Sequence, residues 1–260
     1  MDRENQPLKN VPTQNFRTIL VYSLKTLLWL LAILLLPQII LGVIYGVYYE
    51  VAETSSNIEE VYGTWATSIP VLLSMSFLSP IISIPILLKA SKPKNSKWQL
   101  AIKYWSIDKV QLNILVKWLK YGLVFWLVLS ALPYLLNTPI EQFMKELKVS
   151  HSGVLSLLMI LLTVCLVMPI MEEIIFRGWL YSKINQTQLG GLGALISTST
   201  IFTLIHTQYN HLLTLASVFS LGLLLGFIRY KTGNTSYAIA VHISFNVLSM
   251  CVLYLADIQV

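Results

Sequence analysis

Charged residues are scarce in this 260-residue chain. Asp, Glu, Lys and Arg make up 12% of it, whereas hydrophobic residues make up 55%. A soluble globular domain carries about 25% charged residues. A soluble helical bundle is excluded, because its helices would need polar faces that the long apolar runs lack. Several runs reach the roughly 20 apolar residues that cross a bilayer. The composition therefore predicts an all-α, polytopic membrane protein.

Cysteine is also scarce, and acidic residues are fewer than basic ones. The two cysteines, Cys165 and Cys251, both fall in apolar runs, so we expect reduced core residues and not a disulfide. The net charge of +6 does not indicate nucleic-acid binding, because the lysines gather between apolar runs, as in membrane proteins. The first apolar run begins too late and is too long for a cleavable signal peptide.

The apolar runs predict seven membrane spans. The second contains three prolines and should be kinked, and residues 98–112 mix aromatic and charged residues, which suits an interfacial helix and gives seven to eight helices. Residues 1–16 are polar and predict a flexible cytoplasmic tail. Residues 17–260 should form a single transmembrane domain. The expected spans are about 24–48, 66–90, 113–136, 153–178, 191–207, 211–230 and 235–256.

The loop charges predict the orientation in the cell membrane. Lys and Arg residues precede the first span and lie between the second and third, whereas the segment after the first span is acidic. Because cytoplasmic loops are enriched in Lys and Arg, we expect a cytoplasmic N-terminus. With seven spans, the C-terminus lies outside.

Ionisable residues interrupt the later apolar runs. A charge at the centre of a span costs at least about 2.5–3.5 kcal/mol, so such residues are functional candidates. Glu173 and Arg177 are four residues apart and can form an ion pair on one helical face. Glu172 points about 100° away and is left free for chemistry. The polar positions are Glu172, Glu173 and Arg177; His206; His242 with Asn246; and His211.

The polar face of the fourth helix meets the polar faces that carry His206 and His242 only if the fourth helix is long. The stretch EIIFRGWLYSKI contains no proline, and turn signals come only at 185–191. A turn near residue 187 puts the two glutamates about 15 residues before it and His206 about 19 after it, a mismatch of roughly one turn. His242 lies about nine residues beyond a second turn near Gly233. We therefore expect the three faces to converge inside the membrane.

For each of these residues taken alone, a purely structural role competes with a functional one. A membrane His is usually an interhelical hydrogen bond, Glu173–Arg177 suits a structural pair, and His211 suits the membrane interface. Taken together, a free Glu, two His and an Asn within 75 residues favour a site.

The set of side chains suits hydrolysis of an acyl substrate. A buried carboxylate with a His can activate water, and a second His with an Asn amide can stabilise an oxyanion. Two His and one carboxylate are also a catalytic zinc set, which would use Glu172, His206 and His242. The chain has neither HExxH nor GxSxG, but Ser199 and Ser244 stay open as nucleophiles.

Three motifs in order carry a family resemblance. They are EEIIFR at 172–177, FTLIH at 202–206 and HISFN at 242–246. They resemble the EExxxR, FxxxH and HxxxN/D motifs of the CPBP, or Abi, family of intramembrane proteases, which includes the type II CAAX prenyl endopeptidases. The resemblance covers about 153–250. It implies a cavity among the core helices, water activation by Glu172 and His206, oxyanion stabilisation by His242 and Asn246, and no required metal.

The expected partners are the lipid bilayer and a membrane-associated peptide or protein substrate. Bacterial relatives are associated with the maturation of signal peptides or bacteriocins and with immunity to bacteriocins. Proteolysis in one of these roles ranks first. The alternative is a non-catalytic immunity or scaffold protein that binds a partner, for which Glu172 would be dispensable.

Overall fold

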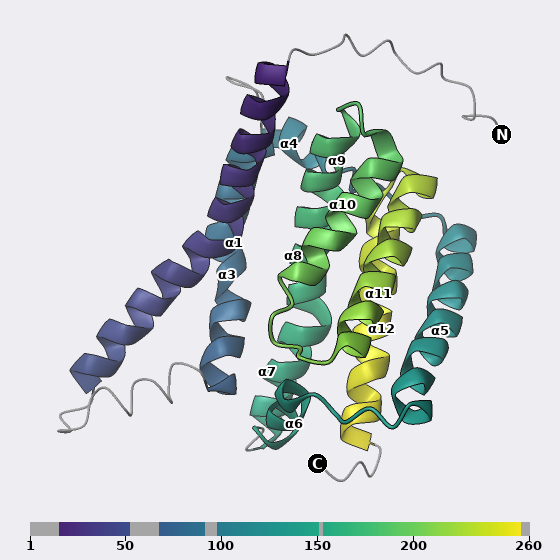
Figure 1. Cartoon of the computed structure of the whole chain (residues 1–260). Helices are drawn as coiled ribbons and strands as arrows, with labels where there is room; N and C mark the ends of the chain where they lie inside the picture. The colour runs from purple at the N-terminus through teal and green to yellow at the C-terminus, as the bar shows by residue number, and fades with distance from the viewer. Residues whose placement is uncertain (1–15, 53–67, 92–97, 151–152, 256–260) are drawn as a thin grey trace.

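The computed structural model describes residues 16–52, 68–91, 98–150 and 153–255, and every regular element in them is a helix. The predicted all-α class is confirmed (Figure 1). The helices outside the motif region are α1 (Phe16–Ala52), α3 (Ile69–Ser91), α4 (Trp98–Tyr104), α5 (Leu112–Leu135) and α6 (Gln142–Val149). The motif region contains the composite helix α7–α9 (Val154–Asn185), α10 (Gly190–Leu204), α11 (Leu212–Thr232) and α12 (Thr235–Leu255).

The described residues contain six helices that are long and apolar enough to span a membrane. The prediction of seven to eight is therefore wrong. The expected span at 191–207 is α10, which has only 15 residues and a length of about 22 Å, less than the roughly 30 Å of a hydrocarbon core. The expected interfacial helix at 98–112 is limited to the seven residues of α4. Helix α6 was not predicted.

The fourth span is one helix of 32 residues, Val154–Asn185. Its predicted continuation beyond residue 178 is confirmed. Two stretches are π-helical, η1 (Thr163–Val167) and η2 (Ile174–Leu180), and the six-residue α8 (Met168–Glu173) lies between them. Pro169 has no N–H to donate to the carbonyl one turn earlier, so a wider turn just before it is a physically reasonable response. The two glutamates thus lie between two departures from α-helical geometry.

Helices α10 and α11 approach closely through two glycines spaced as GxxxG. A Cβ atom at Gly222 would lie 3.2 Å from Ser199 Cβ, and one at Gly226 would lie 3.1 Å from Leu195 Cγ. Small residues at this spacing let two membrane helices pack backbone to backbone. The close approach also brings the main chain of α11 to the buried part of the fourth helix.

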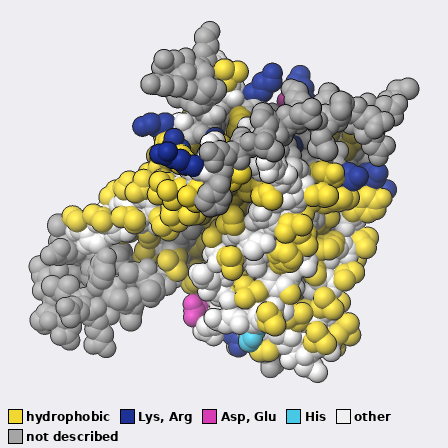
Figure 2. Space-filling model, turned by 45° about the horizontal axis from the view of Figure 1, so that its top comes forward, with side chains coloured by type: hydrophobic (Ala, Val, Ile, Leu, Met, Phe, Trp, Pro, Cys, Tyr) yellow, Lys and Arg dark blue, Asp and Glu magenta, His cyan; other side chains and the backbone are white. Residues whose placement is uncertain are grey.

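The outer surface suits a bilayer. Large apolar side chains are exposed on several spanning helices, among them Val43, Ile81 and Val124. On the face in Figure 2, hydrophobic side chains cover most of the surface and most visible Lys and Arg gather at one end. Helix α1 begins and α12 ends at opposite ends of the bundle (Figure 1). The predicted cytoplasmic N-terminus stays a prediction, and residues 1–15 of the predicted tail lie outside the described residues.

The two cysteines are free, as predicted. Cys165 is buried, but Cys251 is exposed on α12 and not in the core. The expectation that both are core residues is therefore wrong for Cys251, whose side chain faces the membrane surface of the bundle.

Candidate active site

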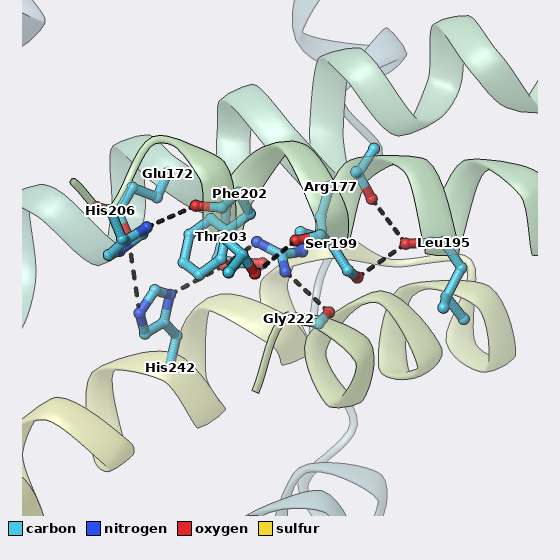
Figure 3. Close-up of polar contacts among 11 residues, drawn as sticks. Glu172, Arg177, Leu195, Ser199, Phe202, Thr203, His206, Gly222 and His242 are labelled. Atoms are coloured by element: carbon cyan, nitrogen blue, oxygen red, sulfur yellow. Dashed lines mark hydrogen bonds and ion pairs between the residues drawn. The ribbon is translucent and has the colours of Figure 1, made fainter. Parts of the chain in front are cut away.

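The two adjacent glutamates have different environments. Glu173 is fully buried, whereas the side chain of Glu172 is 17% exposed. They are neighbours at the end of α8, so their side chains leave the helix in directions about 100° apart. Figure 3 shows Glu172 beside His206 and His242, at one end of the polar cluster, and Arg177 at its centre. Of the two neighbouring carboxylates, Glu172 is therefore accessible and Glu173 is enclosed.

The predicted ion pair between Glu173 and Arg177 is present and buried. Arg177 Nη1 lies 3.0 Å from Glu173 Oε1, and both side chains have no exposed surface. Arg177 Nη2 donates to the carbonyl of Gly222, 2.9 Å away on α11. The guanidinium also lies 4.6 Å from the ring centre of Phe202 on α10, a distance at which a cation and an aromatic face attract. Arg177 thereby joins three helices.

His242 lies between the two carboxylates. Its Nδ1 is 2.9 Å from Glu173 Oε1, and its Nε2 is 3.7 Å from Glu172 Oε2. A carboxylate oxygen only accepts, so Nδ1 carries the proton shared with Glu173. The Nε2 atom then has a proton only when the ring is charged. Glu173 consequently contacts His242 as well as Arg177, a second partner that helical spacing did not reveal.

His206 is positioned by main chain and aromatic rings. Its Nδ1 lies 2.6 Å from the carbonyl oxygen of Phe202. Since a carbonyl cannot donate, Nδ1 carries the hydrogen, and Nε2 of the neutral ring is a proton acceptor. The ring stacks near Tyr209, with centroids 6.1 Å apart and planes 15° apart. The expectation that His206 lies on a helical face is wrong, because α10 ends at Leu204 and His206 begins the following loop.

Asn246 is one turn beyond His242 on α12, as the spacing predicted. Its amide nitrogen donates to the carbonyl of Val164, 2.9 Å away in η1. A π-helical turn shifts carbonyls from their usual partners, so the amide satisfies a backbone group in that turn. An amide has two N–H donors, and this contact uses one of them.

The loop that carries His206 is anchored by a residue that sequence analysis missed. The carboxylate of Glu141 accepts from the main-chain N–H groups of Asn210, at 3.1 Å, and His211, at 3.0 Å. Burial raises the pKa of this carboxyl, but hydrogen bonds from Thr214 and these two N–H groups outweigh burial and lower it. Glu141 lies about 70 residues away in sequence, and no local pattern indicates the contact. His211 serves here as the N-cap residue of α11, consistent with a structural role.

Glu141→Gln should loosen this loop. An amide can accept from only one of the two N–H groups through its oxygen, and hydrogen bonds to charged groups contribute about 1.5–3 kcal/mol each. We expect a lower melting temperature at pH 7 in detergent. Because folding lowers the pKa of Glu141, its carboxylate stabilises the folded protein at pH values above the ordinary pKa of Glu. This stabilisation is lost as pH falls below about 4. The variant and wild type should therefore converge at low pH.

The matched control is Glu146→Gln, which removes an exposed carboxylate from the neighbouring α6. It should melt like wild type at pH 7. If the melting temperatures of Glu141→Gln and wild type differ as much below pH 4 as they do at pH 7, the charge of Glu141 does not hold the loop.

The zinc set that was the alternative is not grouped in the part of the chain that the structure describes. These residues hold no group of three or more His, Cys, Asp or Glu side chains arranged for a metal ion. Of Glu172, His206 and His242, the first and last approach each other at 3.7 Å. The donor arrangement therefore does not support a step through zinc.

The two serines left open as nucleophiles donate to their own helices. Ser199 Oγ donates to Leu195 O at 2.8 Å, and Ser244 Oγ donates to Ala240 O at 2.8 Å. An activated serine needs a neighbouring base that accepts its proton. The hydroxyl protons of both residues are instead engaged with main chain.

Comparison with known proteins matches the region of the chain that carries these residues. Residues 154–248 match the family described as Type II CAAX prenyl endopeptidase Rce1-like. This region is similar to the Rce1-like family. The three motifs fall inside it, and the resemblance to the CPBP family is confirmed. The matched region also coincides with the composite helix, α10, α11, most of α12 and the loops between them, which together hold every predicted site residue.

A curated relative extends the similarity. The chain is 32% identical over 141 residues to a protein of Escherichia coli described as "Uncharacterized 24.3 kDa protein". The aligned segment covers 53% of this chain and 64% of that protein. No solved structure matches the chain. The comparisons thus indicate a membrane region similar to proteases of the CAAX type.

Proposed function

We propose that this protein is an intramembrane endopeptidase that hydrolyses a peptide bond of a membrane-associated peptide or protein. The observation that carries the proposal is the division between Glu172, which is accessible, and Glu173, which is enclosed with Arg177 and His242. Pairs of titratable groups in different environments are typical of acid–base catalysis. One carboxylate can exchange protons with water while the other holds the surrounding side chains.

Glu172 and His206 activate the water. Nε2 of neutral His206 accepts one hydrogen bond of the water, and Glu172 takes its proton as the hydroxide oxygen bonds to the carbonyl carbon. When the C–N bond breaks, the same proton passes to the leaving nitrogen. The products are a carboxylic acid and an amine, and no other reactant is needed.

His242 and Asn246 stabilise the oxyanion. The second N–H of the Asn246 amide and the Nε2–H of protonated His242 are the donors available for it. Glu173 supports this role, because its contact with Nδ1 fixes the ring. Glu173 and Arg177 are positioning residues in this scheme.

The biological role that we propose is peptide maturation or self-immunity by proteolysis in the cell membrane, with a cytoplasmic N-terminus. The test compares membrane peptides from a wild-type strain, a deletion strain and a strain that carries Glu172→Gln. A substrate should accumulate uncleaved in both mutant strains. Normal cleavage in the Glu172→Gln strain, with loss only on deletion, would indicate the alternative of a binding or scaffold protein.

Chelation should leave most activity in place. We propose that no metal takes part, because the described donors are not grouped for zinc. Purified protein that is incubated with a strong chelator should retain more than about half of its peptidase activity. Stoichiometric zinc in active protein, with activity lost on chelation and restored by zinc, would contradict the scheme.

A further inference from the structure

A cavity lies apart from the two carboxylates. It has a volume of about 1120 Å³ and lies between α5, α11 and the turn that precedes α12. The catalytic candidates are not among its lining residues. It is at the end of the bundle where α5 begins and α11 ends (Figure 1).

The lining of this cavity is cationic. Lys109, Lys117 and Lys231 contribute three ammonium groups from separate segments, the loop before α5, the second turn of α5 and the end of α11. Asp108 is the one acidic residue of the lining. The three lysines are exposed, so they can meet a ligand. The balance of charge favours an anion.

The walls of the same cavity are aromatic and aliphatic. Trp118 packs edge to face against Phe227, with ring centroids 6.1 Å apart, and against Tyr121 at 5.7 Å. Ile114 and Leu224 extend the lining along the two helices. A ligand that fits this cavity therefore has an anionic head and an apolar body. Aromatic rings beside lysines are typical of the boundary between headgroups and hydrocarbon.

The base of the cavity is rigid. The amide of Asn234 donates to the carbonyls of Asp108, at 3.1 Å, and Lys109, at 3.3 Å. The hydroxyl of Tyr237 accepts from the N–H of Gln111 at 2.8 Å. These contacts hold the loop before α5 against the α11–α12 turn. The lysines are thus presented from a framework that is formed before a ligand arrives, which lowers the entropic cost of binding.

We propose that this cavity binds the headgroup of an anionic phospholipid, with the phosphate among Lys109, Lys117 and Lys231 and an acyl chain along Trp118 and Leu224. A phospholipid headgroup and a soluble phosphate ester share this anionic group. The apolar walls and the position at the bundle end favour a lipid over a soluble phosphate. Basic cavities between membrane helices recognise anionic headgroups by this combination. The site is independent of the proposed peptidase.

The test measures lipid selectivity of the full chain. Wild-type protein is purified in detergent that contains equal amounts of phosphatidylglycerol and phosphatidylcholine, and bound lipids are counted by native mass spectrometry. The groove variant is Lys109→Gln/Lys117→Gln/Lys231→Gln. The matched control is Lys89→Gln/Lys103→Gln/Lys120→Gln, which removes the same charge from exposed lysines near the same end that do not line the cavity.

Wild type and control should retain phosphatidylglycerol in preference to phosphatidylcholine. The groove variant should lose this preference by at least about tenfold, since each lysine contributes about fivefold near an anionic headgroup. Equal selectivity in the groove variant and the control would overturn the site. Circular dichroism and melting temperature verify that all three proteins are folded. If the groove variant does not fold, Lys117→Gln alone, which should lose about fivefold, replaces it.

Two further measurements identify the class of ligand and the position of the bound lipid. Glycerol 3-phosphate at millimolar concentration should not displace the lipid, and displacement would assign the cavity to a soluble anion instead. In nanodiscs, brominated phosphatidylglycerol should quench tryptophan fluorescence more than brominated phosphatidylcholine does. Trp118→Phe should remove this difference, and a difference that persists would place the lipid elsewhere.

Discussion

Glu172→Gln should reduce peptidase activity by about 10²–10⁴-fold, the usual effect of losing a general base. The amide is nearly the same size as the carboxylate but cannot accept a proton from water. Because Glu172 is partly exposed and its charged contact to His242 is long, at 3.7 Å, the variant should insert and melt like wild type. The measurement is kcat on a substrate peptide from the strain comparison, together with the melting temperature in detergent.

His206→Ala tests the second half of the same step. It removes the Nε2 acceptor while Phe202 and Tyr209 remain in place, so a similar loss is expected. Glu146→Gln is the control for removing a carboxylate, and it should have wild-type kcat. Full activity in Glu172→Gln protein would refute the assignment of Glu172 as the base.

Arg177→Ala should destabilise the protein by about 3–5 kcal/mol, because it leaves the buried carboxylate of Glu173 without its guanidinium. It also removes the donor to Gly222 and the cation near Phe202, so α11 and α10 lose a common partner. The free energy of unfolding in detergent measures the effect. Activity should fall as well, because Glu173 and His242 lose their support.

A double variant separates charge from volume. If the unpaired carboxylate is the cause, Glu173→Gln combined with Arg177→Ala should recover part of the stability that Arg177→Ala loses. A double variant that is no more stable than Arg177→Ala would show that the loss comes from packing and from the Gly222 contact.

Sequence patterns were sufficient for the features that depend on neighbouring residues. The low charge content predicted the membrane class, and i, i+4 spacing predicted the Glu173–Arg177 pair. The absence of proline after Glu172 predicted a long fourth helix, which the convergence of the faces required. Each of these follows from helical geometry over one or a few turns.

Features that depend on tertiary contacts were beyond the sequence. Helix α10 ends at Leu204, whereas the predicted span continued to residue 207, so His206 was placed on a helix. The contact of His242 with Glu173 joins residues 69 positions apart, and Glu141 reaches a loop 70 positions away. Periodicity within a helix contains no information about these distances.

The π-helical turns on either side of Glu172 and Glu173 make the fourth helix sensitive to residue number. A wide turn accommodates one extra residue in a helix, so a deletion inside η1 would leave the flanking segments near their present register. Deletion of one residue from the α-helical stretch 168–171 would instead rotate the two glutamates by about 100° relative to the preceding helix. Glu173 would then turn away from α12, although every motif letter would be intact. In alignments of such sequences, a one-residue gap between residues 168 and 171 therefore has more weight than many substitutions. The spacing between these turns is as much a part of the site as the side chains are.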